Sequence, residues 1–232
     1  MRHEELIETG GERLLTDPFF GTFGNLGYAR LALPARKREE LTDVDLVLLS
    51  HGHFDHLDRT FLRALPPTTP ILIPKRMLFA LWHAGHNVIR QQTWQPYTFG
   101  EITITPVPAV HPAIAVGFVI ESEGKCVYFA GDTYFRPFMN EIRRKFTLDV
   151  ALMPVTTYLI PMTMGEKEAV LAVEALDPKV VIPIHLGIQP RSPFMRTRQS
   201  PESFQQRLQQ AGSKTQVVLL REGETWTGPI LG

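Results

Sequence analysis

The sequence predicts a mixed α/β fold of the α+β kind, built as one domain over residues 1–232. Short runs of β-branched and aliphatic residues alternate with fewer helical stretches, and this pattern is typical of a layered fold. Proline (19 residues) and glycine (17 residues) are spread between these segments, so no linker or repeat divides the chain. A chain of 232 residues can also bury a sizeable core without disulfides.

Eight short apolar runs are typical of buried strands because they are rich in Val, Ile and Leu and are bounded by Gly, Pro or polar residues. They span residues 45–50, 70–74, 102–107, 117–121, 125–130, 150–154, 179–184 and 216–220.

Four stretches between these strands are predicted to be helical, over residues 75–84, 138–146, 166–176 and from 201 to about 211. Phe138, Ile142 and Phe146 recur every fourth residue and form one apolar stripe. The last helix has the clearest start, with Ser200 as N-cap and Pro201 in the first helical position.

Composition excludes several classes of function. Lys+Arg and Asp+Glu both number 24, so the net charge is zero, which argues against bulk nucleic-acid binding. A single Cys can form neither an internal disulfide nor a thiolate-rich zinc cage. No apolar run is long enough for a transmembrane helix, and no signal-peptide core is visible. We therefore expect a cytoplasmic protein.

Histidine is the residue type whose distribution points to chemistry, with eight copies in the chain. His51, His53, Asp55 and His56 lie directly after the predicted strand 45–50. On a turn that leaves a strand these side chains can converge on one point, and Gly52 adds conformational freedom. Imidazole suits zinc, iron, copper and nickel, and carboxylates widen the choice towards manganese.

Three further strand-like runs end in a residue that can bind metal: His111, Asp132 and His185. Strand ends in layered folds are where functional sites collect. Each of these residues alone would be unremarkable, but together with the cluster they supply five His and two Asp. That is enough for two metal ions that share one ligand.

The spacing His51-x-His53-x-Asp55-His56, followed in order by His111, Asp132 and His185, resembles the metallo-β-lactamase-fold hydrolases. Within that superfamily the chain is similar to the ascorbate-6-phosphate lactonase-like branch and the related N-acyl-phosphatidylethanolamine phospholipase D group. The segments that carry this closer likeness are Ser50-His-Gly-His-Phe-Asp-His-Leu-Asp58, Ala130-Gly-Asp-Thr133, Met162-Thr-Met-Gly165 and Val181-Ile-Pro-Ile-His185. The lactamases proper have a Cys in the second metal site, whereas Cys126 lies mid-strand, so antibiotic hydrolysis is not expected.

The resemblance implies a four-layer αββα sandwich with two divalent metals, Zn²⁺ first and Mn²⁺ or Fe as alternatives. It implies a first metal on His51, His53 and His111, a second on Asp55, His56 and His185, and Asp132 as a bridge. Bound metal lowers the pKa of water from about 15.7 to roughly 7, which provides a bridging hydroxide at neutral pH. Asp55 would orient that nucleophile or pass a proton to the leaving group.

The reaction implied is hydrolysis of an ester, lactone or phosphodiester in a small molecule, with anionic molecules among the candidates. A phospholipid- or nucleotide-type phosphodiesterase is the alternative to a lactonase. A redox di-iron protein and a metal binder without catalysis are two further alternatives, the former disfavoured by His53 and the chain length. The sequence leaves the oligomeric state open, including a homo-oligomer.

Several other residues carry two readings each. Arg191, with Arg196 and Arg198, would either grip an anionic substrate or form a solvated loop, and Tyr158 would either line the pocket or pack in the core. Asp58 and Thr133 are candidates to orient the imidazoles, or else cap and turn residues. His83 and His86 are expected at the surface or in an interface.

Overall fold

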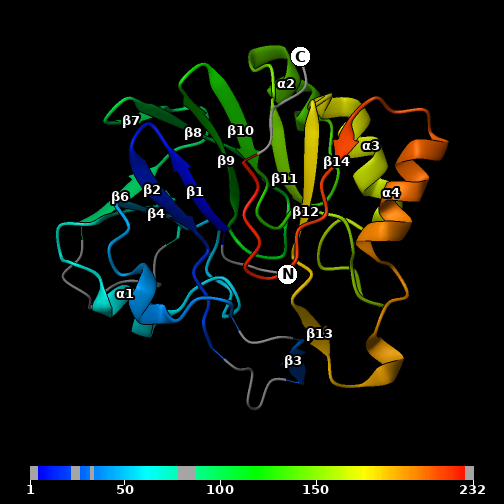
Figure 1. Cartoon of the computed structure of the whole chain (residues 1–232), viewed down its shortest axis with the longest axis horizontal. Helices are drawn as coiled ribbons and strands as arrows, with labels where there is room; N and C mark the ends of the chain where they lie inside the picture. The colour runs from blue at the N-terminus through cyan, green and yellow to red at the C-terminus, as the bar shows by residue number, and fades with distance from the viewer. Residues whose placement is uncertain (1–4, 22–26, 32–33, 78–86, 228–232) are drawn as a thin grey trace.

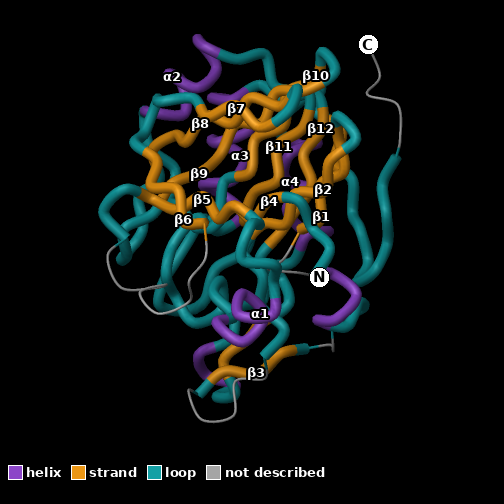
Figure 2. Tube along the Cα trace, turned by 90° about the vertical axis from the view of Figure 1, so that its left-hand side faces the viewer, coloured by secondary structure: helices purple, strands orange, loops and turns teal. Residues whose placement is uncertain are grey.

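The computed structural model describes residues 5–21, 27–31, 34–77 and 87–227. Two large sheets face each other, and each has helix on its outer side, so the expected four-layer αββα arrangement is present (Figure 1). Helices α3 and α4 lie outside the larger sheet, whereas α1 lies by the smaller one, at the lower end of the molecule (Figures 1 and 2).

The smaller sheet has five strands in the order β1-β2-β4-β5-β6. Its strands are β1 (Glu5–Thr9), β2 (Glu12–Thr16), β4 (Leu46–Leu48), β5 (Pro70–Pro74) and β6 (Asn87–Gln91). Strands β1 and β2 form an antiparallel hairpin, and the pairs from β2 through β6 are parallel. Parallel strands end at the same edge, so the loops that follow β2 and β4 emerge side by side.

The larger sheet has seven strands in the order β14-β12-β11-β10-β9-β8-β7. Its strands are β7 (Tyr97–Phe99), β8 (Ile102–Pro108), β9 (Val116–Ser122), β10 (Lys125–Phe129), β11 (Val150–Pro154), β12 (Val180–Ile184) and β14 (Gln216–Val217). Strands β7 to β10 are antiparallel neighbours, whereas β10, β11, β12 and β14 run parallel. A short ribbon of β3 (Tyr28–Arg30) and β13 (Ile188–Pro190) stands apart from both sheets.

The helices are α1 (Arg59–Ala64), α2 (Phe138–Lys145), α3 (Glu166–Leu176) and α4 (Pro201–Gln210), with two 3₁₀ turns, η1 (Arg38–Leu41) and η2 (Pro193–Met195). Helix α4 begins as predicted. The Ser200 hydroxyl accepts from the Ser203 backbone N–H, and the Ser203 hydroxyl accepts from the Ser200 backbone N–H. Helix α3 has the predicted limits.

Strand periodicity produces the layers, because alternate residues face opposite sides of a sheet. Leu46 and Leu48 pack between the two sheets, whereas Val47 faces the α1 side. In the larger sheet Leu152 packs between the sheets, and Met153 faces α2, α3 and α4. Cys126 in β10 belongs to this outer helical core and is 8% exposed.

Two local expectations need correction or fall outside the described residues. Residues 75 and 76 form a turn rather than the start of a helix, and residues 78–86, with His83 and His86, lie outside the described ranges. Helix α1 and the β3–β13 ribbon were not predicted, since six and three residues are too short for a clear periodic signal. Within the described ranges, no helix has the length and apolar character needed to cross a bilayer.

Candidate metal centre

The seven predicted residues come together at one end of the two sheets. The loop between β4 and α1 carries His51, His53, Asp55 and His56 from the smaller sheet. The larger sheet contributes the other three, just beyond the ends of β8, β10 and β12: His111, Asp132 and His185.

The side chains form sets of three with the spacing that one metal ion requires. In His51, His53 and His111 the candidate ligand atoms lie within 4.8 Å of one another, and the same holds for Asp55, His56 and His185. His111 Nε2 lies 2.9 Å from His53 Nδ1, which brings one nitrogen from each sheet to the same point.

Asp132 lies between the two sets. Its Oδ2 is 3.8 Å from His111 Nε2, 3.5 Å from His56 Nε2 and 3.3 Å from His185 Nε2. The carboxylate thus contacts one histidine of the first set and two of the second. This is the arrangement in which one carboxylate can serve two ions.

Asp17 is a residue of this site to which the sequence reasoning assigned no role. It directly follows β2 and is fully buried. Its Oδ2 is 2.9 Å from His56 Nδ1 and accepts a 2.5 Å hydrogen bond from Ser50 Oγ, which in turn lies 2.9 Å from His51 Nδ1. Carboxylates that engage one imidazole nitrogen orient the other towards a metal. The only sequence signal is an acidic residue at a strand end.

The two residues that had been considered for this orienting task have other contacts. Asp58 is the N-cap of α1, accepting from the backbone N–H groups of Thr60 and Phe61, and it also pairs with Arg38 at 2.8 Å. Thr133 Oγ1 accepts from the Val110 backbone N–H, beside His111. For Asp58 the cap reading is therefore correct, and Thr133 supports the loop rather than an imidazole ring.

The backbone at the centre adopts conformations that side-chain-bearing residues rarely take. His185 has a φ of 62° and Asp17 a φ of 40°. Gly131, next to Asp132, has a φ of 56°, and a Cβ atom there would lie 2.6 Å from Ser50 Cβ. Positive φ at a non-glycine residue is costly and concentrates at functional sites.

Electrostatics keep two histidines of the first set neutral. Burial, followed by the nearby His56, holds the pKa of His51 well below its ordinary value. Burial also lowers the pKa of His111 to about 4, against the opposite influence of Asp132. Neutral imidazoles have a free lone pair at neutral pH, which is the form that binds metal.

His56 and Asp132 shift in the opposite sense because they face each other. Burial alone would lower the pKa of His56, but the carboxylates of Asp132 and Asp55 raise it well above the ordinary value. Burial alone would raise the pKa of Asp132, yet His185 and His56 hold it well below the ordinary range. Asp132 is therefore ionised in the folded protein.

Two buried polar atoms that lack a hydrogen-bond partner in the described part of the chain also indicate that a metal ion fits this site. His51 Nε2 and Asp132 Oδ1 are buried and have no hydrogen-bond partner among the described residues. Leaving a buried polar atom unsatisfied costs about 1–3 kcal/mol, so such atoms call for a partner. A divalent cation satisfies an imidazole nitrogen and a carboxylate oxygen at once.

Of the predicted substrate-contacting residues, Tyr158 lies beside this centre, whereas Arg191 is exposed just beyond the end of β13. The Tyr158 hydroxyl donates to the Ile188 carbonyl at 3.1 Å, and its ring centroid is 6.4 Å from that of His185. Arg191 Nε donates to the Tyr28 carbonyl at 3.0 Å, and Arg196 Nε to the Pro190 carbonyl at 2.9 Å.

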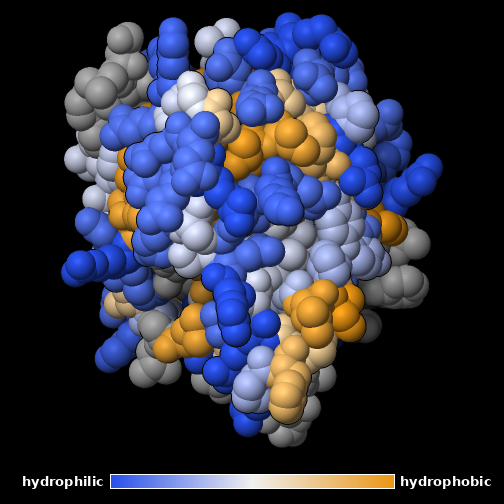
Figure 3. Space-filling model, turned by 90° about the vertical axis from the view of Figure 1, so that its right-hand side faces the viewer, coloured by the Kyte–Doolittle hydropathy of each residue, from blue (hydrophilic) through white to orange (hydrophobic). Residues whose placement is uncertain are grey.

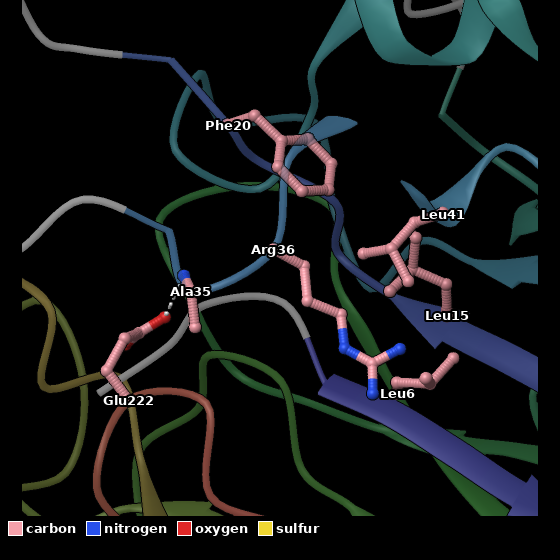
Figure 4. A pocket seen from close by; sticks show the side chains of 7 residues that line it. All are labelled: Leu6, Leu15, Phe20, Ala35, Arg36, Leu41 and Glu222. Carbon is pink, nitrogen blue, oxygen red and sulfur yellow. Dashed lines mark hydrogen bonds between the residues drawn. The ribbon is translucent and has the colours of Figure 1, made fainter. Parts of the chain in front are cut away.

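A separate shallow pocket lies against the smaller sheet (Figure 4). The side chains that line it are Leu6, Leu15, Phe20, Ala35, Arg36, Leu41 and Glu222. Glu222 accepts a hydrogen bond from the Ala35 backbone N–H. Since no candidate metal ligand lines it, we assign it no part in the chemistry.

Comparison with known proteins agrees with the fold. Residues 12–186 match the family described as the β-lactamase superfamily domain. A UPF0173 metal-dependent hydrolase of Methanopyrus kandleri is 32% identical over 233 residues, covering 95% of this chain and 94% of the relative.

Solved structures show the same fold. Igni18, a metallo hydrolase of the archaeon Ignicoccus hospitalis, superposes with a TM-score of 0.78 at 24% identity, covering 96% of this chain and 93% of the other. The isothiocyanate hydrolase from Delia radicum gut bacteria has a TM-score of 0.80 at 18% identity, covering 98% and 97%. The chain thus belongs to the β-lactamase superfamily and, within it, to the UPF0173 metal-dependent hydrolases.

Proposed function

We propose that the protein is a dinuclear metal-dependent hydrolase of esters, lactones or phosphodiesters. His51, His53 and His111 would hold one ion, Asp55, His56 and His185 the other, and Asp132 both. Zn²⁺ suits these imidazole and carboxylate ligands, with Mn²⁺ or iron as the alternatives. Nearly full-length similarity to relatives named metal-dependent hydrolases supports the reaction class.

The observation that carries this proposal is the position of Asp132 between the two histidine sets, with Oδ2 3.3 to 3.8 Å from three imidazole nitrogens. A purely structural metal site encloses one ion with protein ligands and needs no shared carboxylate. Two adjacent sites joined by one carboxylate are the arrangement used in two-metal hydrolysis.

Two bound divalent ions supply a hydroxide at neutral pH and stabilise the oxyanion that forms on a carbonyl or phosphorus centre. The protein's own part is positional and acid–base. Asp17 and Ser50 hold the His51 and His56 rings with Nε2 towards the centre. Asp55, half-buried beside His56 with Oδ2 3.8 Å from Nε2, would orient the nucleophile or pass a proton to the leaving group.

The test combines metal content with hydrolysis. We expect about two zinc, manganese or iron ions per purified chain by elemental analysis, and turnover of p-nitrophenyl acetate or bis(p-nitrophenyl) phosphate that a chelator abolishes. Asp132→Ala should lose metal and activity together. Full metal occupancy and unchanged hydrolysis in Asp132→Ala would overturn the proposal.

The same two substrates separate the two hydrolase types. An esterase or lactonase should prefer the acetate ester, whereas a phosphodiesterase should prefer the phosphodiester, each by kcat/KM. An ultraviolet–visible spectrum of the purified protein tests the redox di-iron alternative, because an oxo-bridged iron pair absorbs light and a zinc pair does not.

A further inference from the structure

Large exposed apolar side chains gather around the metal centre. The described residues include eight of them, and seven lie in the loops at this end: Leu31, Phe54, Val110, Ile114, Leu159, Ile160 and Phe194. The eighth, Leu171, lies in α3. Figure 3 shows apolar surface at the lower end of the molecule, where β3 and β13 lie in Figure 1. Concentration of exposed apolar surface in one place marks a binding site.

These loops are tied to the candidate ligands and to one another. Phe54 lies between His53 and Asp55, and Val110 precedes His111. The Leu31 backbone N–H donates to the Gly187 carbonyl at 2.8 Å, two residues beyond His185. The Met162 carbonyl, just after Leu159 and Ile160, lies 2.8 Å from His111 Nδ1. The loops that carry most of these apolar residues therefore border the site.

Three rings form a continuous aromatic wall from the surface to the centre. The Phe54 and Tyr28 ring centroids are 6.4 Å apart, those of Tyr28 and Tyr158 5.6 Å, and those of Tyr158 and His185 6.4 Å. Phe54 is 45% exposed, whereas Tyr28 and Tyr158 are half-buried. These distances are in the range of favourable aromatic packing.

Two hydrogen bonds hold the wall in place. The Tyr158 hydroxyl donates to the Ile188 carbonyl at 3.1 Å. Arg191 directs Nε to the Tyr28 carbonyl at 3.0 Å, which fixes the backbone that carries the Tyr28 ring.

Resting on the proposed function, we propose that Tyr28, Phe54 and Tyr158 bind an uncharged aryl group of the substrate next to the bond that is cleaved. The substrate class is then an aryl-bearing ester or related electrophile, recognised through its ring. Arg191 is a positioning residue of the wall, acting through the Tyr28 backbone.

Binding is tested first with acetophenone, a neutral aryl ketone that has no bond to hydrolyse, by ligand-observed NMR on the metal-loaded protein. Tyr158→Ala and Phe54→Ala should each weaken binding about 3- to 10-fold, the range expected for loss of one aromatic contact. Tyr158→Phe keeps the ring and should bind within about 2-fold of the parent. Leu171→Ala is the matched control, because Leu171 is 46% exposed, as Phe54 is 45% exposed.

Kinetics then compare methyl phenylacetate with methyl acetate, which share a leaving group and differ by one aryl group. In Tyr158→Ala, the ratio of kcat/KM for the aryl ester to kcat/KM for methyl acetate should fall about 3- to 10-fold. Metal content is measured in every variant, since Phe54 lies between two candidate ligands. A fall in this ratio at full metal content supports the wall.

Three results would overturn the inference. Acetophenone binding could be equal in the parent, Tyr158→Ala and Phe54→Ala. Phenyl phosphate could bind more tightly than acetophenone and depend on Arg191 instead of the rings. Phe54→Ala could change the oligomeric state while leaving acetophenone binding intact, which would make the apolar surface a contact between copies.

Different experimental results would contradict the aryl-binding inference and the proposed function. If acetophenone binding depends on the rings but no ester or phosphodiester is hydrolysed, the aryl-binding wall is supported and the proposed hydrolase function is contradicted. Chelator-sensitive hydrolysis that is unchanged by substitution of any of the three rings supports the proposed enzyme and contradicts the proposed aryl-binding wall.

Discussion

At the scale of single residues, two buried aspartates at the same end of the smaller sheet have different tasks. Asp17 contacts Ser50 and His56, whereas Asp58 contacts the first backbone N–H groups of α1 and the guanidinium of Arg38. Asp17 is held at a positive φ of 40°. A strained backbone persists where the surrounding structure enforces it, and here it places a carboxylate behind two imidazoles.

Asp17→Asn should weaken metal binding about 10- to 100-fold, the usual effect of losing a carboxylate behind a ligating histidine. The amide keeps the size of the side chain but loses the charge that engages His56 Nδ1 and Ser50 Oγ. Competition with a chromogenic chelator measures the affinity. The matched control is Asp58→Asn, which keeps an N-cap acceptor, loses the charge that pairs with Arg38, and should leave metal affinity unchanged. Equal affinity in Asp17→Asn and the parent protein would contradict this role.

At the scale of elements, the turn after β10 brings Asp132 into the centre. Gly131→Ala should lower the free energy of unfolding by about 2 kcal/mol or more, from a strained φ plus a clash. The new Cβ would lie 2.6 Å from Ser50 Cβ, next to His51. Gly124→Ala is the control, since Gly124 also has a positive φ (69°) but nothing lies within 4 Å of a Cβ there. Chemical denaturation of both variants measures the difference, and equal losses would show that the Ser50 contact is unimportant.

Helices α3 and α4 are joined by a buried carboxylate. Glu166, 5% exposed, accepts hydrogen bonds from the Ser200 N–H at 2.9 Å, the Ser203 hydroxyl and Arg207 Nε at 2.7 Å. Burial alone would raise its pKa, but the hydrogen bonds from Ser203, Arg207 and Ser200 outweigh burial and hold the pKa below its ordinary value.

Glu166→Gln should therefore destabilise the protein by about 1–3 kcal/mol at neutral pH, where the carboxylate is ionised in both folded and unfolded states. A depressed folded pKa contributes stability that is full above the unfolded pKa of about 4.5. That stability is lost as the pH falls through the folded value. Urea unfolding across this window should show the gap between parent and variant closing towards acid pH. A gap independent of pH would contradict a role for the charge.

Strands and long helices were predictable because their signals are local and repeated. The run 150–154 is apolar throughout, and β11 has the same limits, because a strand between two packed layers is buried on both faces. Helix 75–84 was wrong at its start, since a Pro before a polar residue also suits a turn. Strands β1 and β2 were missed because charged residues interrupt their short apolar runs, which read Glu-Leu-Ile-Glu-Thr and Glu-Arg-Leu-Leu-Thr.

At the scale of the whole molecule, the candidate ligands come from both sheets. His51, His53, Asp55 and His56 follow the smaller sheet, and His111, Asp132 and His185 follow the larger one. A metal bound to both groups cross-links two layers whose shared core is apolar. Metal binding should therefore stabilise the fold as a unit.

Removing metal with a chelator should lower the unfolding temperature, and restoring it should reverse the change. At a free metal concentration 100 times the Kd, one site adds about 2.7 kcal/mol to the free energy of unfolding. Calorimetry with and without zinc measures the shift. His111→Ala should reduce it because it removes the larger sheet's histidine from the first set. An unfolding temperature that does not respond to metal would exclude a site spanning both sheets.

The seven candidate ligands could be identified from the sequence because each follows a strand and the residue types are rare in combination. Asp17 and the aromatic wall could not be assigned, because their roles depend on contacts between residues far apart in the chain. Tyr28 meets Tyr158 only through the β3–β13 ribbon, and three-residue strands leave little trace in a sequence.

Because Cys126 is the single cysteine, the loops around the metal centre can be labelled site-specifically for spectroscopy. Cys126 is buried in β10, and burial, followed by Glu121 and Asp149, raises the pKa of its thiol to about 12. Thiol reagents react with the thiolate form, so Cys126 does not react with them at neutral pH. A cysteine introduced on the loop of Phe54 and another near Leu159 would then be the reactive pair. Spin or fluorescent labels placed there can report how far apart these loops stand before and after a ligand arrives.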